Sequence, residues 1–566
     1  MISSAADPVQ PAVRLGWPDG LAIAVLVLVG AAIWFPRMSL DRPVTHDGTV
    51  YIAGAQSLAA GDGYRYQGWI GQPRIGFYPP LHSVAMAPLF RGNPPLSEAL
   101  PRVNWLVFAE ATLAAVAMFW FCRNAGVPCG PMFGVMLCVV TSQAWIGTID
   151  GLLSDFLFMA ILYGWVLPLA RMPASGRGAW GWLALGVGFA ALCLTRSAAL
   201  AWMPLFGAGL LFGTASWRGR LAGAVPVVLA WVGWALWARH ATGYDVVLKA
   251  QMDEEIGGWS GMPAAMLRNA VECLTGLPLW GMTSAFLWRP PLGFVAGGPI
   301  VGSVLFGARL LLALSLFVLA GLGVRRALAG ADVAARDWLV PPWVRPRRRS
   351  FEVLRVTGVA AYLATLAVLP SPAFGWSRYL LVVLPCFVAW TWAGLSAVLR
   401  TRIDGPWPQR LLLALLFANA AVNWEYERTF ARSEGRDGAQ SARAMRAVAR
   451  WIRTNTPSTA RIAGDFRIPN RHLAEELGRP LVIDYLEPAS RWQPLAHAEQ
   501  GFPRADYVVI GREDLAVRWN SILFSVAFLR PTNLYCVLKV DPARESEFRR
   551  RHGIPDERPA GFGVQR

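Results

Sequence analysis

Several ionisable side chains fall where apolar stretches of the sequence begin or end. Asp47 follows the first such stretch, and Asp150 and Asp155 flank the start of the fourth. Arg196 lies between the fifth and sixth stretches, and Arg378 begins the tenth. A charge close to membrane hydrocarbon is costly, so each of these residues needs a partner or a function.

Carboxylates and guanidinium groups at the same depth suggest a particular chemistry. Arginine presents a planar fork that matches phosphate oxygens, and a phosphate headgroup lies at the membrane boundary. A neighbouring carboxylate could remove the proton of an acceptor hydroxyl. A base and a stabilised phosphate leaving group are what a direct displacement at a sugar carbon requires, and such a displacement inverts the anomeric configuration.

Structural roles are alternatives for the same residues. Asp47 precedes a helical run and could be its N-cap, and Asp155 could cap the fourth stretch. Arg196 and Arg378 could be interfacial anchors that bind no ligand. The residue types and their spacing leave both interpretations open.

The composition is that of a membrane protein. Of the 566 residues, 55% are hydrophobic and only 16% are charged, whereas soluble domains contain roughly 25% charged residues. The net charge of +17 comes from arginine far more than from lysine. Much of it lies in short loops between apolar stretches, as the positive-inside rule expects. This distribution argues against a nucleic-acid partner.

About eleven apolar stretches approach the roughly 20 residues that a transmembrane helix needs. They are residues 18–36, 103–122, 131–148, 154–170, 179–195, 197–214, 221–239, 300–324, 352–370, 378–399 and 409–424. No small-residue cleavage site follows the first stretch, so we expect it to be a span and not a removed signal peptide.

The arginines are distributed unequally between the two sides of these spans. One set of short loops is rich in arginine, whereas the alternate loops near 149–153 and 371–377 contain no Lys or Arg. The asymmetry places the N-terminus in the cytoplasm and, with an odd number of spans, the C-terminus on the opposite face. The segments 37–102, 240–299 and 425–566 then lie on the outer face, which indicates extracytoplasmic chemistry.

Two of these outer segments have predictable secondary structure. Residues 47–61 repeat apolar side chains at helical spacing, which predicts a short helix on the membrane surface. The last segment alternates helix-like pieces with strand-like pieces, at 442–453, 460–463, 471–477, 480–484, 507–510 and 534–540. We therefore expect a membrane domain over 1–424 and a small α/β domain over 425–566.

The candidate residues stand in a pattern that resembles one known family. The run Thr45-His46-Asp47-Gly48-Thr49-Val50-Tyr51 is similar to the first outer loop of GT-C glycosyltransferases, in particular the branch of protein O-mannosyltransferases and the lipid A aminoarabinose transferase. Further elements of that branch follow in order, and they are Tyr78-Pro79-Pro80-Leu81, Arg102, Ser154-Asp155, Leu194-Thr195-Arg196 and Arg378-Tyr379.

The resemblance implies roles for individual residues. It implies a polyprenyl-phosphate sugar as donor, Asp47 as the catalytic base, and Arg196 and Arg378 as ligands of the donor phosphate. The residues expected near the substrate or a metal are His46, Tyr51, Tyr78, His82, Asp150, Asp155 and Tyr379.

The pattern departs from the family at one position. Many members have Asp-Glu at the catalytic position, whereas Gly48 follows Asp47 here. The second carboxylate is missing, which leaves metal use open. A divalent cation, if one binds, would have Asp47, Asp155 and His46 as its nearest candidate ligands, and no other cofactor is expected.

The sequence therefore predicts an all-α, GT-C-like polytopic membrane bundle with a small C-terminal α/β extracytoplasmic domain, located in a bacterial inner membrane. The expected function is inverting transfer of a hexose or pentose from a polyprenyl-phosphate donor to a hydroxyl of a glycan, lipid or protein acceptor. Two other functions fit the same charges: a polysaccharide ligase or polymerase that uses a diphosphate-linked donor, and a lipid or sugar transporter. Transporters often contain paired repeats, and no long repeat is evident here.

Overall fold

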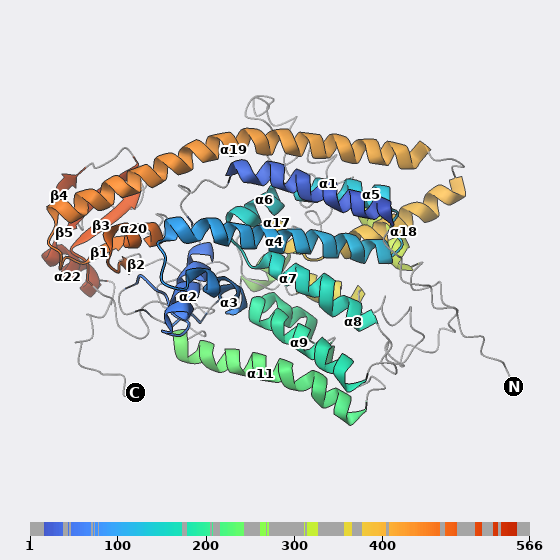
Figure 1. Cartoon of the computed structure of the whole chain (residues 1–566), viewed down its shortest axis with the longest axis horizontal. Coiled ribbons are helices and arrows are strands. Elements are labelled where there is room, and N and C mark those ends of the chain that lie inside the picture. Colours follow the sequence, from blue (N-terminus) through green and yellow to red (C-terminus); the bar gives the residue numbers. More distant parts are fainter. Residues whose placement is uncertain are drawn as a thin grey trace.

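The computed structural model is a bundle of helices with a five-stranded sheet in the C-terminal part of the chain (Figure 1). It describes residues 16–37, 44, 47–69, 72, 74–76, 78–171, 178–203, 206–207, 216–242, 261–267, 269–270, 311, 314–325, 356–364, 376–402, 407–464, 470–483, 504–511, 524–529 and 534–551.

Three described helices are long and apolar enough to cross a membrane: α1 (Trp17–Trp34), α4 (Leu96–Asn124) and the Trp217–Arg239 part of α11 (Trp217–Thr242). Shorter apolar helices accompany them, including α9 (Ala179–Thr195) and the Leu384–Leu395 part of α18 (Leu384–Arg402). The protein is thus a multi-pass membrane protein with a mostly helical fold. The count of about eleven spans stays a prediction, since the stretches at 197–214, 300–324 and 352–370 lie only partly within the described residues.

One predicted span is broken. The stretch 131–148 forms α5 (Cys129–Val140) and α6 (Gln143–Asp150), which meet at an angle of 50°. The Thr141 hydroxyl donates to the carbonyl of Leu137 (2.8 Å), and the Ser142 hydroxyl accepts from the amide of Trp145 (3.2 Å). These hydroxyls satisfy backbone groups at the end of one helix and the start of the next, which lets the helix break inside the bundle.

The fourth stretch is also irregular. It consists of α7 (Asp155–Ile161), one turn of π-helix η3 (Leu162–Val166) and α8 (Leu167–Arg171). The 378–399 stretch corresponds to α17 (Trp376–Leu381) followed by α18.

The first outer segment contains the helix that the apolar spacing predicts. This helix, α2 (Asp47–Ala60), is followed by Gly61 with a left-handed φ of +84°. Short helices α3 (Leu81–Met86) and η2 (Ala87–Phe90) lead from it to α4. Most of the α2 side chains are buried, so the helix is part of the packed structure.

The C-terminal strands form one sheet with the order β2-β1-β3-β5-β4. Its strands are β1 (Ile462–Gly464), β2 (Val482–Ile483), β3 (Tyr507–Gly511), β4 (Phe524–Leu529) and β5 (Tyr535–Val540). The pairs β1–β2 and β1–β3 are parallel, and β3–β5 and β4–β5 are antiparallel. Four of the strands were predicted from the sequence, and β4 was missed.

Helices α20 (Asn470–Leu477), α22 (Pro542–Arg551) and the end of α19 (Trp407–Asn455) accompany the sheet. Helix α19 is continuous across residue 424, where the sequence analysis placed a domain boundary. The predicted last span and the predicted helix at 442–453 are therefore two parts of one 49-residue helix.

Most helices run between two opposite ends of the bundle (Figure 1). In Figure 1, the sheet lies at the left, together with the start of α4 and the ends of α9 and α11. Asp47, Asp155 and Arg196 belong to element ends on this same side.

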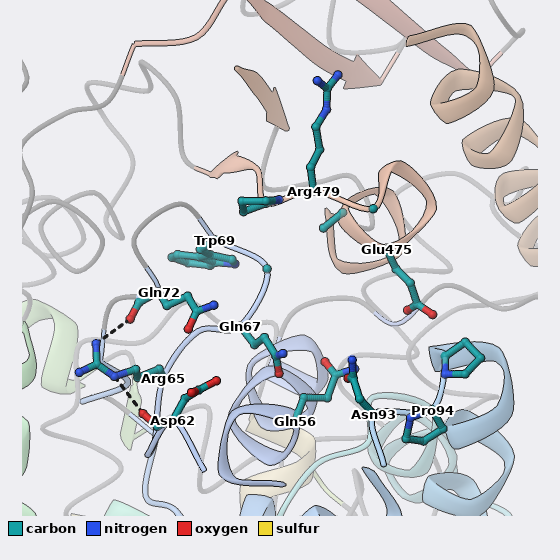
Figure 2. Close-up of a pocket in the computed structure, with 15 residues that line it drawn as sticks. Gln56, Asp62, Arg65, Gln67, Trp69, Gln72, Asn93, Pro94, Glu475 and Arg479 are labelled. Carbon is teal, nitrogen blue, oxygen red and sulfur yellow. Dashed lines mark hydrogen bonds between the residues drawn. The ribbon is translucent and has the colours of Figure 1, made fainter. Parts of the chain in front are cut away.

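The first outer segment touches the C-terminal part directly. The amide of Leu481 donates to the carbonyl of Gly68 (2.9 Å), and Trp69 forms an isolated parallel bridge with Leu481. The Glu475 carboxylate accepts from the amide of Leu96, at the start of α4. A polar cavity lies between these parts (Figure 2).

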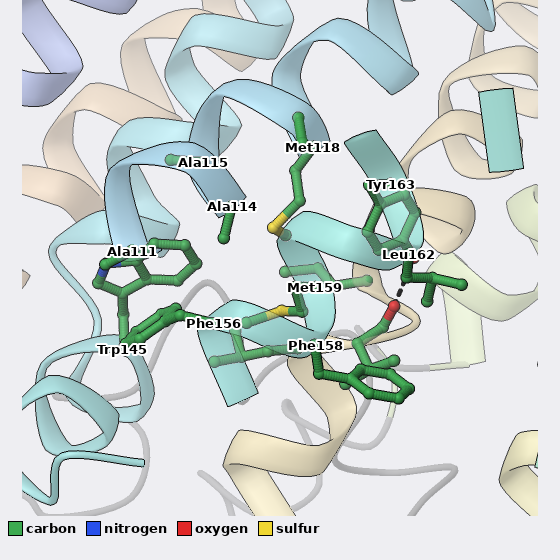
Figure 3. Packing of buried hydrophobic residues seen from close by; sticks show 14 of the residues in the cluster. Ala111, Ala114, Ala115, Met118, Trp145, Phe156, Phe158, Met159, Leu162 and Tyr163 are labelled. Carbon is green, nitrogen blue, oxygen red and sulfur yellow. Dashed lines mark hydrogen bonds between the residues drawn. The ribbon is translucent and has the colours of Figure 1, made fainter. Parts of the chain in front are cut away.

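The core of the bundle lies where α4 packs on α6, α7 and η3 (Figure 3). Small side chains of α4, such as Ala111 and Ala114, let the large side chains of the other helices approach closely. The rings of Trp145 and Phe156 are 4.5 Å apart between centroids. This rigid layer holds the end of α6 and the start of α7 against the outer segment.

We expect the contact between α9 and α11 to depend on Gly186. A Cβ at this position would collide with the backbone of Gly223, and small residues allow such close approach in membrane helices. Gly186→Val should cost about 1–3 kcal/mol of stability through overpacking. The measurement is the apparent melting temperature of the purified protein in detergent.

The matched control for this prediction is Gly233→Val in α11, where a Cβ would meet no atom within 4 Å. An equal melting temperature for the two variants would contradict the packing argument.

Candidate functional site

Asp47 is the first residue of α2, and its carboxylate is held by a tyrosine. The Tyr78 hydroxyl donates to Oδ1 of Asp47 (2.8 Å). Gly48 explains the missing second carboxylate, because a Cβ at this position would collide with the carbonyl oxygen of Gly151. The start of α2 therefore packs directly on the turn between α6 and α7, and only glycine fits there.

Tyr51 connects α2 to the start of α7. Its hydroxyl is 2.8 Å from the Ser154 hydroxyl in a buried hydrogen bond. The ring of Tyr51 meets those of Tyr78 and His82 edge to face, with centroids 5.5 and 4.9 Å away. Three of the residues expected near the substrate thus form one aromatic group, and Tyr78 joins this group to the carboxylate of Asp47.

Asp155 and Arg196 form an ion pair between Oδ2 and Nη1. The Asp155 side chain is fully buried and that of Arg196 is only 13% exposed. The guanidinium carbon of Arg196 also lies 5.2 Å from the ring centroid of Tyr379, within the range of a cation–π contact. Residues from α7, from the end of α9 and from α17 therefore meet at one point.

Tyr51 lies within the electrostatic influence of both Asp47 and the Asp155–Arg196 ion pair. Burial raises the pKa of the Tyr51 hydroxyl; the charge of Arg196 opposes this rise, and the charges of Asp47 and Asp155 add to it. Burial, followed by the charge of Asp47, also raises the pKa of Tyr78. Both hydroxyls therefore stay protonated at neutral pH, and Tyr78 remains a donor to Asp47.

His82 also has polar partners on its buried side. Its side chain is fully buried, with Nε2 3.2 Å from the carbonyl of Leu152 and Nδ1 3.4 Å from Oε2 of Glu110. Leu152 has a left-handed φ of +51°, so His82 supports an unusual backbone turn just before Ser154.

Glu110 was not predicted as a member of this region, and Ser154 was predicted only as part of the Ser154-Asp155 element, without a role for its hydroxyl. Glu110 is a buried acid inside the apolar helix α4, and the cost of such a charge was the available signal. The role of the Ser154 hydroxyl had no signal in the sequence, because its partner Tyr51 is 103 residues away.

Three predicted residues are less fully placed. Asp150 is the half-buried last residue of α6, beside the turn that Gly48 contacts. Arg378 belongs to α17, but its side chain lies outside the described residues, as does His46 entirely.

A metal site receives no support from the described part of the chain. No three His, Cys, Asp or Glu residues within that part are grouped to hold a metal ion. Asp155, one of the candidate ligands, instead pairs with Arg196.

Comparisons with known proteins identify the fold. No protein-family model matches the chain, and no curated protein matches its sequence. Among solved structures, ArnT from Cupriavidus metallidurans bound to undecaprenyl phosphate has a TM-score of 0.50 and 12% sequence identity, covering 92% of this chain and 98% of its own. The apo state of that protein has the same TM-score, the same coverage and 13% identity.

An archaeal oligosaccharyltransferase, AglB from Archaeoglobus fulgidus, has a TM-score of 0.46 and 12% identity, covering 88% of this chain and 70% of its own. At these identities, the ArnT structures show a shared fold over nearly the whole chain. The chain thus shares the fold of the ArnT structures, in agreement with the GT-C-like fold that the residue pattern predicted.

The buried ion pair generates a prediction about stability. Arg196→Leu would leave the fully buried Asp155 without its partner, which typically costs about 3–5 kcal/mol. The double variant Asp155→Asn/Arg196→Leu should recover much of this loss. The measurement is the apparent melting temperature of each variant, with Arg91→Leu as an exposed control. Additive losses in the double variant would show that the pair is not coupled.

Proposed function

We propose that this protein is an inverting glycosyltransferase, which moves a hexose or pentose from a polyprenyl-phosphate donor to an acceptor hydroxyl. The observation that carries the proposal is the meeting of Asp47 and Arg196 around Tyr51, at one end of the helix bundle. A carboxylate held by a hydrogen bond and a guanidinium held by an ion pair are the two groups that such a displacement requires.

The base in this mechanism is Asp47. Its Oδ2 or Oδ1 takes the proton of the acceptor hydroxyl as the acceptor oxygen forms a bond to the anomeric carbon. The bond from that carbon to the donor phosphate breaks, and its electron pair goes to the phosphate oxygen. The hydrogen bond from Tyr78 orients the Asp47 carboxylate before the reaction, so less reorganisation is needed in the transition state.

The phosphate ligands are Arg196 and Arg378. A guanidinium group has five N–H donors, and the ion pair with Asp155 uses Nη1 of Arg196. Asp155 and the Tyr379 ring thus fix the direction of the Arg196 side chain while its positive charge faces the donor phosphate. Undecaprenyl phosphate bound to ArnT, a protein with the same fold, supports a lipid phosphate as the donor headgroup.

The proposed site lies on the outer face of a bacterial inner membrane. In this arrangement about eleven helices within residues 1–424 hold the donor lipid, the N-terminus is cytoplasmic, and residues 425–566 form a periplasmic α/β domain. The arginine-poor loops at the end of the bundle that carries Asp47 and Asp155 support this orientation.

Replacing the proposed base tests the mechanism. Asp47→Asn keeps the shape of the side chain but cannot accept the proton, so transfer should fall by at least about a hundredfold. The assay follows a radiolabelled sugar from undecaprenyl monophosphate to acceptor in membrane extracts, with undecaprenyl diphosphate sugar as the comparison donor.

The control for this variant is Glu98→Gln, an exposed acid at the start of α4. It should transfer sugar at the wild-type rate. Full activity of Asp47→Asn would refute the assignment of the base, and preference for the diphosphate donor would favour a polysaccharide ligase.

The orientation is tested by labelling from outside. Ser97→Cys lies exposed at the start of α4, on the side of the sheet, and Gly178→Cys lies exposed before α9, on the other side. A membrane-impermeant maleimide applied to spheroplasts should label Ser97→Cys and leave Gly178→Cys unlabelled. The reverse pattern would place the site on the cytoplasmic face and would contradict the proposed transfer on the outer face.

A further inference from the structure

A cavity of about 970 Å³ lies away from the candidate site, between the first outer segment and α20. Its walls come from residues within 62–69 and Gln72, from Asn93–Pro95 before α4 and from the end of α20 and the turn after it, up to Pro480. Figure 2 shows side chains from these parts facing one another across the space. The cavity is therefore formed only when the outer segment and the C-terminal part are together.

The lining is rich in side-chain amides. Gln56, Gln67, Gln72 and Asn93 all face this space, and Trp69 adds a large aromatic ring (Figure 2). The Gln67 Oε1 atom is buried and has no hydrogen-bond partner in the described part of the chain. Each amide can both donate and accept, so the cavity matches a ligand whose groups do the same.

The aromatic ring is held in place on one side. Trp69 stacks on Tyr66, with centroids 4.2 Å apart and planes at 15°. The hydrogen bond between Leu481 and Gly68 fixes the adjoining backbone. A flat ring that is stacked on one face and lies next to polar amides suits a ligand that has an apolar face and polar edges.

The two cations of the lining are engaged elsewhere. Arg479 points away from the cavity and donates to the carbonyls of Pro457 (3.1 Å) and Ser458 (2.6 Å) (Figure 2). Arg65 donates to the carbonyls of Asp62 and Gln72. The remaining charged groups, Asp62 and Glu475, are acidic, which disfavours a phosphate or carboxylate ligand.

Two residues of the lining also have a paired backbone. The backbone of Arg65 forms an antiparallel β-bridge with Arg74, and that of Trp69 forms a parallel β-bridge with Leu481. A peptide that adds as a strand needs unpaired backbone groups at an edge, whereas this cavity offers side chains. The lining thus favours a saccharide, whose hydroxyls suit the amides and whose C–H face suits the indole ring.

We infer that this cavity binds an uncharged oligosaccharide portion of the acceptor. Gln56 is nine residues beyond Asp47 on α2, which is about 13 Å along the helix axis. The bound sugar units are therefore separate from the reacting hydroxyl, and the cavity selects the acceptor by its distal glycan. The acceptor role rests on the proposed transferase function, whereas glycan binding can be measured by itself.

The experiment uses the full-length protein in lipid nanodiscs on an array of neutral oligosaccharides, phosphorylated oligosaccharides and peptides. The wild type should bind neutral oligosaccharides. For the neutral glycan bound best, Trp69→Ala and Gln67→Ala should weaken the affinity about tenfold or more, since central contacts of this kind dominate binding. Trp69→Phe keeps a ring and should retain most of the affinity.

Two further variants complete the design. Trp180→Ala removes an exposed tryptophan at the start of α9 and should bind as the wild type does. Asp47→Asn should bind the glycan normally while losing transfer, which separates this inference from the catalytic proposal. Folding of each variant is checked by its melting temperature, and Gln67→Ala serves if Trp69→Ala is unstable.

Glycan binding by the cavity variants decides whether the inference holds. Neutral-glycan binding that is lost in Trp69→Ala or Gln67→Ala supports the inference even if Asp47→Asn proves fully active. Absence of any neutral ligand, a preference for peptides or phosphorylated glycans, or wild-type affinity in both cavity variants would overturn it.

Discussion

The candidate site depends on one buried charge. The Asp155 side chain has no exposed surface, so its carboxylate is tolerated only because the guanidinium of Arg196 lies against it. That pairing brings the end of α9 to the start of α7, and the cation–π contact of Arg196 adds Tyr379 of α17. Three elements far apart in the sequence are thereby held at one end of the bundle.

Close backbone packing adds the fourth element. Because residue 48 is glycine, the start of α2 can lie on the turn between α6 and α7. Asp47 is thereby brought close to the start of α7, where Asp155 pairs with Arg196. Tyr51 and Tyr78 then link α2 to Ser154 and orient the Asp47 carboxylate. The absence of a second carboxylate at this position thus has a packing reason, because any side chain at residue 48 would collide with the carbonyl oxygen of Gly151.

The C-terminal part is tied to the same outer segment. Helix α19 runs without a break from the bundle to the sheet, Leu481 contacts Gly68 and Trp69 of the outer segment, and Glu475 contacts Leu96 at the start of α4. The polar cavity lies between these parts. One segment of chain therefore carries the proposed base at its start and side chains of the proposed glycan-binding cavity further on, which would couple acceptor choice to catalysis through the short helix α2.

The sequence by itself indicated a mostly helical membrane protein, the helix at 47–60 and four of the five strands, and it singled out Asp47, Asp155 and Arg196 as candidate site residues. Apolar runs, helical spacing and the cost of charges near hydrocarbon are local signals, so they are visible without a structure. Only the tertiary structure decided the break at Thr141 and Ser142, the place of β4 at the sheet edge, and the partners Ser154 and Glu110. These depend on contacts between residues that are distant in sequence, and no local pattern encodes which of several polar groups will be brought together.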